Sequence, residues 1–190
     1  MKMPFPISLA FKLITASLLL AGCNSENSTD TGMDALLATG ENLPVVETSI
    51  TSLVAEFARD PSATKFQDLQ GNGFEIEDLQ GKKVFLNYWA TWCAPCIREI
   101  PAIARAAAEL EDENYIFLLA SDESADIISN FIEDREFSGN FVKLNGFFGG
   151  HGIDAVPSSI LYDENSQMMK SWAGSFEWDS PEMLAALRDE

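Results

Sequence analysis

The stretch VFLNYWATWCAPCIREIP, residues 84–101, decides the fold. It opens with Val84–Ala90, a nearly continuous run of β-branched and aromatic residues that is typical of a buried central strand. Cys93 and Cys96 follow, separated by two residues. Apolar residues then recur at helical spacing as far as Leu110, so the sequence predicts a strand, a CxxC motif and a helix in succession. The apolar positions of that helix are Ile97, Ile100, Ile103, Ala104, Ala107 and Leu110.

A CxxC motif can belong to a zinc site, a structural disulfide or a redox pair. A zinc site needs four ligands, but beyond Cys23 the chain offers only these two cysteines and His151. A disulfide across two residues closes a very small loop and stabilises little. At a helix N-terminus, by contrast, the first thiol is expected to face solvent and the second to be less exposed. The positive end of the helix lowers the pKa of the first thiol. We therefore predict that Cys93 is a nucleophile and that Cys96 resolves the mixed disulfide.

The remainder of the domain alternates between strands and helices. Glycines at 71 and 73 predict a hairpin-like turn, and Tyr115–Ser121 reads as a second buried strand. Two further strands, at 158–163 and 168–173, flank the polar turn Asp163–Gln167. One helix is predicted at 125–137, and its apolar face consists of Ile127, Ile128, Phe131 and Ile132. A last helix is predicted to begin at Asp179-Ser180-Pro181-Glu182, where Asp179 is suited to be the N-cap. This order predicts an α/β sheet covered on both faces.

The N-terminal residues have the pattern of a targeting signal. Lys2 and Lys12 precede an apolar stretch that is too short to span a bilayer, and Leu20-Ala21-Gly22-Cys23 resembles a bacterial lipobox. The resemblance implies a lipidated Cys23 at the start of the mature chain; an ordinary signal peptide or a core helix is the alternative. We expect a signal peptide at 1–22, a tether at 23–43, a helical extension at 44–63 and a single α/β domain at 64–190.

The extension carries its own helical pattern. Ile50, Leu53, Val54, Phe57 and Ala58 share one face, and Asp60-Pro61 ends the segment. We expect this helix to pack on the domain that follows.

The composition and net charge of the chain limit the class of partner that it can bind. The chain has 190 residues, of which 46% are hydrophobic, so a packed core is within reach. Its net charge is −18, and signal cleavage removes two lysines and no acid, which gives −20. Nucleic acid is approached by clustered Lys and Arg, so this charge argues against a nucleic-acid partner.

Two separated motifs resemble the thioredoxin superfamily. WCAPC after FLNYWAT, with Pro101 five residues past Cys96, is similar to membrane-tethered thiol–disulfide oxidoreductases of the TlpA/ResA type. GIDAVPSSILYDENSQ, residues 152–167, resembles the segment that holds the cis-proline of that family. The resemblance runs from about Phe66 to the C-terminus. It implies a thioredoxin-like fold, with a central mixed sheet and helices on both faces, and an oxidoreductase that needs no cofactor and no metal.

The resemblance also implies roles for particular residues. Val156-Pro157 is expected to be a cis bond facing the cysteines, and Trp92, Val156 and Pro157 are expected to contact the substrate. Asn87 stands where cytosolic thioredoxins carry an aspartate, so that proton relay is absent. Glu99, three residues after Cys96, is expected to exchange a proton with Cys96; a solvated surface acid is the alternative reading.

The sequence therefore predicts a disulfide reductase of the bacterial envelope. We expect it to be anchored through Cys23 facing the periplasm, with Asn24 favouring the outer membrane in a Gram-negative host. Its expected partners are a disulfide-bearing envelope protein and a membrane thiol donor. One alternative is a Cu(I) metallochaperone using Cys93, Cys96 and His151. A peroxiredoxin-like peroxidase is the other, although Thr91 lies two residues before Cys93, where a Thr-x-x-Cys motif needs three.

Overall fold

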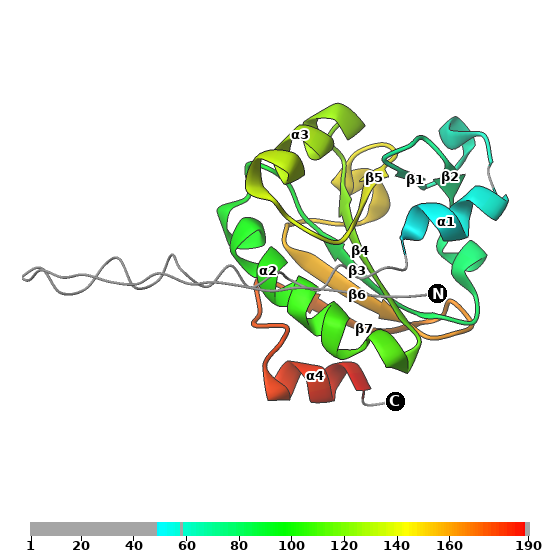
Figure 1. Ribbon diagram of the computed structural model, residues 1–190. Helices are drawn as coiled ribbons and strands as arrows, with labels where there is room; N and C mark the ends of the chain where they lie inside the picture. The colour runs from blue at the N-terminus through cyan, green and yellow to red at the C-terminus, as the bar shows by residue number, and fades with distance from the viewer. Residues whose placement is uncertain (1–48, 58, 189–190) are drawn as a thin grey trace, which may run out of the picture. The chain divides into compact units, whose positions relative to one another are not determined.

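A seven-stranded mixed sheet forms the centre of the molecule (Figure 1). The computed structural model describes residues 49–57 and 59–188. The strands are β1 (Phe66–Asp68), β2 (Gly73–Phe74), β3 (Lys83–Tyr88), β4 (Tyr115–Ser121), β5 (Asn140–Leu144), β6 (Ser158–Tyr162) and β7 (Met168–Ala173). Their order across the sheet is β2-β1-β5-β4-β3-β6-β7. The predicted turn around Asn72 joins β1 to β2, and the two strands predicted at 158–163 and 168–173 pair as β6 and β7.

The centre of the sheet is parallel and its edges are antiparallel. β3 pairs in parallel with β4, and β4 with β5, because a helix crosses over between the members of each pair. β6 runs antiparallel to β3, in a register that sets Asn87 opposite Ser159. β3 is buried along its length from Val84 to Tyr88, as its sequence predicts. The C-terminal ends of β3 and β4 therefore lie side by side at one end of the sheet's strands, and the CxxC motif follows β3 there.

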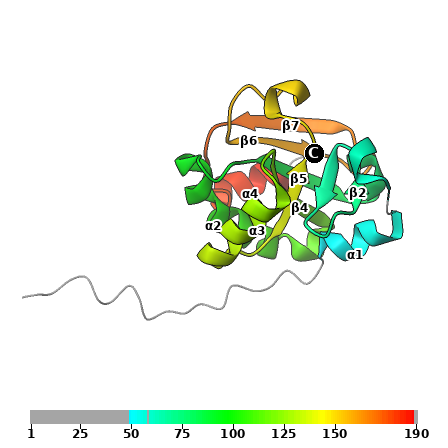
Figure 2. The same ribbon diagram turned by 90° about the horizontal axis from the view of Figure 1, so that it is seen from above.

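Helices cover both faces of the sheet, as predicted (Figure 2). The α-helices are α1 (Ile50–Val54), α2 (Ala94–Glu109), α3 (Ala125–Arg135) and α4 (Pro181–Arg188). The 3₁₀ turns are η1 (Ala55–Phe57), η2 (Pro61–Ala63), η3 (Ile76–Leu79), η4 (Glu111–Glu113) and η5 (Phe148–His151). Side chains of α2, α3 and α4 pack on one face with Phe85, Trp89 and Phe117. Those of α1 and η3 pack on the other face with Leu86, Tyr88 and Leu118.

The N-terminal helix joins the second of these core layers. Ile50 and Val54 are buried there, which confirms that the predicted helix packs on the domain. The α-helix itself ends at Val54, before the predicted end, and continues as η1. The side chain of Phe57 and all of Ala58 lie outside the described residues.

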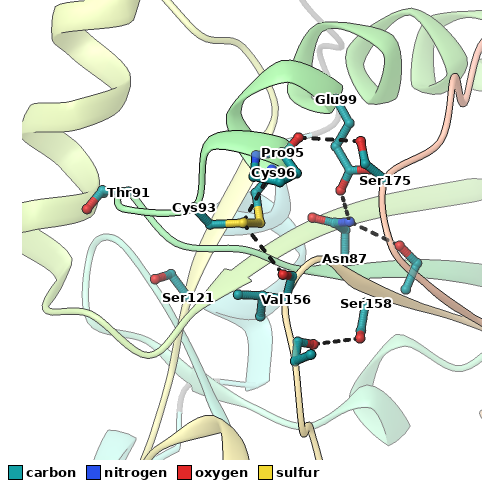
Figure 3. Close-up of a disulfide and its surroundings, with 12 residues drawn as sticks. Asn87, Thr91, Cys93, Pro95, Cys96, Glu99, Ser121, Val156, Ser158 and Ser175 are labelled. Carbon is teal, nitrogen blue, oxygen red and sulfur yellow. Dashed lines mark hydrogen bonds between the residues drawn. A yellow bond between two sulfur atoms is a disulfide. The ribbon is translucent and has the colours of Figure 1, made fainter.

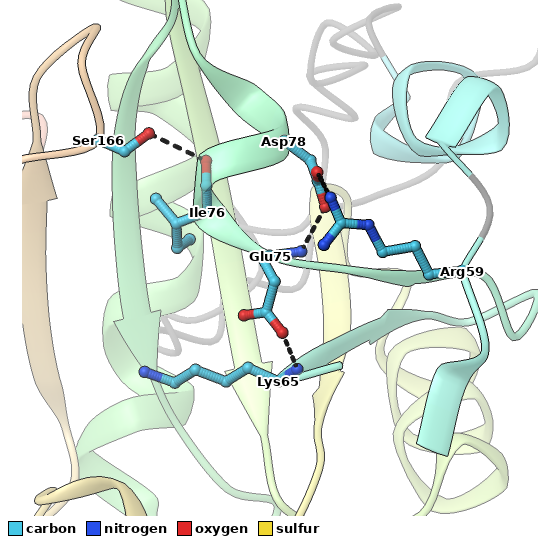
Figure 4. Close-up of polar contacts among 6 residues, drawn as sticks. All are labelled: Arg59, Lys65, Glu75, Ile76, Asp78 and Ser166. Carbon is cyan, nitrogen blue, oxygen red and sulfur yellow. Dashed lines mark hydrogen bonds and ion pairs between the residues drawn. The ribbon is translucent and has the colours of Figure 1, made fainter. Parts of the chain in front are cut away.

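Polar contacts fasten the segment after that helix to the sheet (Figure 4). Arg59 pairs with Asp78, whose other oxygen accepts the Glu75 N–H at 2.8 Å. The Glu75 carboxylate in turn accepts the Lys65 N–H at 2.7 Å. On the opposite side, the Ser166 hydroxyl donates to the Ile76 carbonyl oxygen. Residues on both sides of the predicted boundary at 63/64 thus share one hydrogen-bonded cluster.

Four details of the sequence prediction are wrong. Ile127, assigned to the apolar face of α3, is 49% exposed, and Ile128 alone of that helix is buried. On α2, the positions between the predicted ones, Ala102 and Ala106, are buried, while Ala104 and Ala107 are half-buried. The N-cap of α4 is Ser180, whose hydroxyl accepts the Met183 N–H, and Asp179 pairs with Arg105 instead. The strand β5 has no counterpart in the prediction.

The predicted signal peptide, Cys23 and the tether at 23–43 fall on residues 1–48, outside the described part of the chain. Across residues 49–57 and 59–188, none of the helices combines the length and apolar character that crossing a bilayer requires.

Candidate active site

Cys93 and Cys96 form a disulfide at the N-terminus of α2 (Figure 3). Cys93 is the N-cap residue, and its sulfur accepts the Cys96 N–H with an Sγ–N distance of 3.3 Å. Pro95 lies in the first turn, where the missing N–H costs nothing because those amides have no partner within the helix. The site thus combines a bonded sulfur pair with the positive end of a sixteen-residue helix, as predicted.

The two sulfurs differ in exposure less than the sequence suggested. Cys96 is fully buried at 0% exposure, and Cys93 retains 5%. The order is the predicted one, but the expected solvent-facing position of Cys93 is wrong in this oxidised form. Packing against the proline loop accounts for the difference, because the carbonyl oxygen of Val156 lies 3.7 Å from Cys93 Sγ.

The Val156–Pro157 peptide bond is cis, as the resemblance implied. It immediately precedes β6, the strand that pairs with β3, and this pairing holds the proline loop beside the cysteines. A disulfide sulfur carries no proton, so the contact between Cys93 and the Val156 oxygen becomes a donated hydrogen bond only when Cys93 is a thiol.

Glu99 lies beneath the disulfide and is 2% exposed, so its interpretation as a solvated surface acid is wrong. One carboxylate oxygen accepts from Asn87 Nδ2 at 2.8 Å. The other accepts from the Phe176 N–H at 3.1 Å and from Trp178 Nε1 at 3.2 Å. Burial raises the pKa of Glu99 above its ordinary value, and these hydrogen bonds oppose the rise without cancelling it.

Asn87 is the side chain of β3 that binds this carboxylate. Its amide nitrogen donates to Glu99 and to the Ser159 hydroxyl, and the side chain is completely buried. Its amide oxygen has no hydrogen-bond donor and is turned toward the disulfide (Figure 3). A fully buried carbonyl without a donor is costly, so this oxygen marks a place where a donor is favoured when the site changes state.

A carboxylate from the loop after β4 holds the segment that leads into Cys93. Glu123 accepts the Thr91 N–H at 2.8 Å and the Thr91 hydroxyl at 2.6 Å. The Thr91 hydroxyl therefore points to Glu123, and this contact does not support the Thr-x-x-Cys arrangement of the peroxidase alternative. Trp92, which follows, is 69% exposed.

His151 does not converge with the cysteines. Its Nε2 forms a hydrogen bond with the carbonyl oxygen of Asn145, which folds the ring back onto its own loop. Within residues 49–57 and 59–188, His, Cys, Asp and Glu side chains nowhere gather in a group of three suited to a metal ion. The copper alternative, which required Cys93, Cys96 and His151 together, has no geometric support.

The aromatic residues around the site differ in burial. Trp178 is completely buried and forms edge contacts with Phe85 and Trp172, so it belongs to the core. Phe148 is half-buried against Tyr88, whereas Phe147 is 68% exposed. No local pattern indicates that Phe176 and Trp178 donate to Glu99, because the loop that holds them is distant in the chain.

Comparisons with known proteins agree with this geometry. The model of the AhpC/TSA family matches residues 54–186. The thiol-disulfide oxidoreductase ResA of Bacillus cereus is 32% identical over 110 residues, which are 56% of this chain and 64% of that protein. ResA of Bacillus subtilis is 27% identical over 114 residues, covering 57% and 63%. The chain thus spans less than two thirds of these curated relatives.

Solved structures share the fold. StoA from Bacillus subtilis superposes with a TM-score of 0.54 at 18% identity, over 68% of this chain and all of that one. The exposed lipoprotein thioredoxin Etrx1 from Streptococcus pneumoniae gives 0.54 at 21% identity, over 66% and 97%. The sheet, the CxxC helix and the cis-proline loop together define a thioredoxin-like fold that carries a CxxC disulfide. Within that class, the chain belongs to the AhpC/TSA family.

Proposed function

We propose that this protein is a thiol–disulfide oxidoreductase of the bacterial envelope that reduces disulfides in other proteins. The observation that carries the proposal is the Cys93–Cys96 disulfide at the N-terminus of α2, in contact with the cis-proline loop. The ResA relatives, which are named thiol-disulfide oxidoreductases, support exchange between thiols and disulfides at this pair. The same cysteine pair can exist as a dithiol, and the two forms differ by two electrons and two protons.

The reaction begins from the dithiol. The Cys93 thiolate attacks one sulfur of the client's disulfide; that bond breaks, Cys93 becomes joined to the client, and the second client sulfur leaves as a thiolate that takes up a proton. Cys96 then loses its proton, and its thiolate attacks Cys93 Sγ. The mixed disulfide breaks, the client leaves with both sulfurs reduced, and the Cys93–Cys96 disulfide seen in the structure is formed.

Glu99 is proposed to receive the proton of Cys96 in the second step. The two residues are three apart on the buried side of α2, and Asn87 lies between the carboxylate and the sulfurs (Figure 3). Because the pKa of the Glu99 carboxyl is raised, it lies closer to the pKa of a thiol. Proton transfer from Cys96 to Glu99 is therefore less unfavourable.

Trp92, Val156 and Pro157 are proposed to contact the client. Val156 and Pro157 border Cys93 from the loop before β6, and Trp92 precedes Cys93 with an exposed ring. A client chain that lies along the proline loop places its own sulfur next to Cys93.

Substitution of each cysteine tests the assignment of roles. Cys96→Ser is expected to accumulate mixed disulfides through Cys93, because the second step has lost its attacking sulfur, whereas Cys93→Ser is expected to accumulate none. Non-reducing electrophoresis followed by mass spectrometry of the trapped adducts gives the result. Alkylation of the reduced wild-type protein at neutral pH provides the control, and preferential labelling of Cys96 would reverse the roles.

The direction of electron flow follows from the residues around the sulfurs. Ala94 and Pro95 add no charge between the cysteines, and Pro95 removes an N–H that would stabilise a thiolate. We expect a reduction potential closer to thioredoxin's, about −270 mV, than to that of a strong oxidant, about −120 mV. Equilibration with glutathione at pH 7 measures it, and a value above about −170 mV is incompatible with a reductant.

The proposed location and partners extend the sequence prediction. A lipid anchor at Cys23 would hold the domain at the membrane facing the periplasm, with the outer membrane favoured in a Gram-negative host. A reductant in an oxidising compartment needs a supply of electrons, so a membrane thiol donor is part of the proposal. The lipoprotein nature of the structural relative Etrx1, stated in its name, is consistent with such an anchor.

A further inference from the structure

Large apolar side chains are exposed at four positions among the described residues: Trp92 (69%), Ile127 (49%), Phe147 (68%) and Met168 (64%). Met168 begins the edge strand β7. The other three belong to segments that surround the loop between β4 and α3, at the same sheet edge as Cys93. Scattered exposed apolar residues are ordinary, but three of them on neighbouring segments at the same end of the sheet as Cys93 favour contact with another molecule.

Two adjacent carboxylates form hydrogen bonds with the segments that carry Trp92 and Phe147. Glu123 accepts both the N–H and the hydroxyl of Thr91, which precedes Trp92. Asp122 accepts the N–H of Phe148, which follows Phe147, at 3.2 Å. Both aromatic residues are thus carried by segments attached to one dipeptide. Ile127 lies in the first turn of α3, four residues beyond Glu123.

The exposed ring of Phe147 is supported by the backbone beneath it. A Cβ atom placed on Gly149 would stand 3.2 Å from the ring, and one on Gly150 would stand 3.3 Å from it. The glycines therefore allow the ring to lie against the main chain, while most of its surface faces solvent. A side chain held in this way loses little conformational freedom when a partner covers it.

The loop between β4 and α3 and the first turn of α3 carry charge of one sign. The chain has no Lys or Arg between Arg105 and Arg135, and the loop and first turn of α3 carry Asp122, Glu123 and Asp126. The whole chain is strongly acidic as well, at −18. Complementary charge favours a cationic partner and disfavours a second copy of this chain or an anionic lipid surface.

We propose that Trp92, Ile127 and Phe147 form a docking surface for the client polypeptide, and that the preferred client segment carries apolar side chains together with Lys or Arg around its disulfide cysteine. The inference rests on the proposed disulfide exchange at Cys93 and states which substrates that site selects. The apolar side chains cover the three exposed residues, and the basic ones meet the carboxylates of the β4–α3 loop.

Disulfide-linked dimers of short peptides test the selection. Three sequences are compared as substrates of the reduced full chain in detergent: Lys-Leu-Cys-Phe-Lys, Glu-Leu-Cys-Phe-Glu and Glu-Ser-Cys-Ser-Glu. Glutathione disulfide serves as the reference, and each rate constant is expressed relative to it. We expect the basic apolar peptide to react about tenfold faster than the acidic polar one, with the acidic apolar peptide between them, and the preference to fall as salt rises.

Variants then assign the preference to the surface. Ile127→Ser and Phe147→Ser are each expected to reduce it about threefold, and Phe147→Leu, which keeps an apolar side chain, is expected to retain it. Asp126→Lys, at an exposed position, is expected to weaken the preference for the basic peptide alone. Met168→Ser is the matched control, since Met168 is equally exposed but lies on the edge strand, and it is expected to behave like the wild type.

The outcomes separate the inference from the proposed function. Failure of the wild-type protein to reduce glutathione disulfide or any of the peptides contradicts the oxidoreductase itself. Reduction of all three peptides at equal relative rates overturns the docking surface while leaving the oxidoreductase intact, as does a loss of preference in Met168→Ser equal to that in Phe147→Ser. Sedimentation that shows a dimer dissolved by Ile127→Ser assigns the surface to self-association and also overturns the inference.

Discussion

Burial and hydrogen bonding act in opposite directions on the Glu99 carboxyl. Three donors face its two oxygens, an arrangement that suits the ionised form, yet burial dominates and the pKa is raised. A carboxyl whose pKa is higher in the folded than in the unfolded state binds its proton more tightly when folded. It therefore costs stability above its ordinary pKa, and the cost is fully developed once the pH exceeds the raised value.

This sign gives a stability prediction for Glu99→Gln. Gln does not titrate, so the free energy of unfolding of the wild type, minus that of the variant, is expected to fall as the pH rises from about 4 through the raised pKa. The fall is about 1.4 kcal/mol for each unit by which the pKa is raised. Urea unfolding at several pH values measures the difference, in which the many other acids cancel. A difference that grows with pH means that the folded site favours the carboxylate.

The site was predictable from sequence where chemistry and spacing coincide. Cys93 and Cys96 are identified by their position after a buried strand, and Pro157 by the resemblance of its segment. The surroundings of Glu99 were not predictable in the same way. Trp178 comes from a loop 79 residues away, and nothing in its local sequence distinguishes a donor to a buried carboxylate from an ordinary core residue.

At the start of α4, two neighbouring residues are suited to be the N-cap, but only one of them has that role. Asp179 and Ser180 both precede Pro181, and either is a suitable N-cap by residue type. The chain uses Ser180 because its hydroxyl reaches the Met183 N–H, which leaves Asp179 to pair with Arg105 on α2. Sequence alone does not show that Arg105 is near, so the choice between the two caps depends on the packing of α4 against α2.

Alanine substitutions at these two positions are expected to differ. Ser180→Ala removes the cap of a helix that buries Met183 and Leu187, and is expected to lower the free energy of unfolding by about 1 kcal/mol. Asp179→Ala removes a partly exposed ion pair, and is expected to cost less than about 0.5 kcal/mol. Thermal or urea unfolding of the two variants provides the comparison, and a larger loss from Asp179→Ala would contradict the assignment of the cap.

Element existence was easier to predict than element boundaries or exposure. The strands with continuous apolar runs, β3 and β4, were identified because they lie between two covered faces. β5 was missed because it is only five residues long and is interrupted by Lys143, and because its place in the sheet depends on pairing with β1 and β4. Ile127 fits a helical stripe by spacing, but the stripe on α3 is narrower than the pattern because that helix buries only Ile128.

At the scale of the whole molecule, charge and attachment are linked. A chain with a net charge of −18 is repelled by an anionic membrane surface, so a covalent lipid would be needed to keep it there. We expect Cys23 to supply that attachment. Mass spectrometry of the mature chain is expected to show an acylated Cys23 at its N-terminus, and Cys23→Ala to release a soluble protein or leave an uncleaved precursor. An unmodified Cys23 on the mature wild-type chain would remove the anchor from the proposal.

The sulfur of Cys93 is also the cap of α2, and this has a consequence for the helix. A sulfur in a disulfide is a weak acceptor, whereas a thiolate is a strong one, so the Cys96 N–H is bound more firmly once the protein has gained electrons. The first turn of α2 should then open less often, and its amide protons should exchange with solvent more slowly, in the reduced protein than in the oxidised one. The rigidity of this part of the main chain thus depends on the oxidation state of the cysteine pair. A partner that binds the first turn of α2 can therefore distinguish the reduced protein from the oxidised one before any disulfide is exchanged.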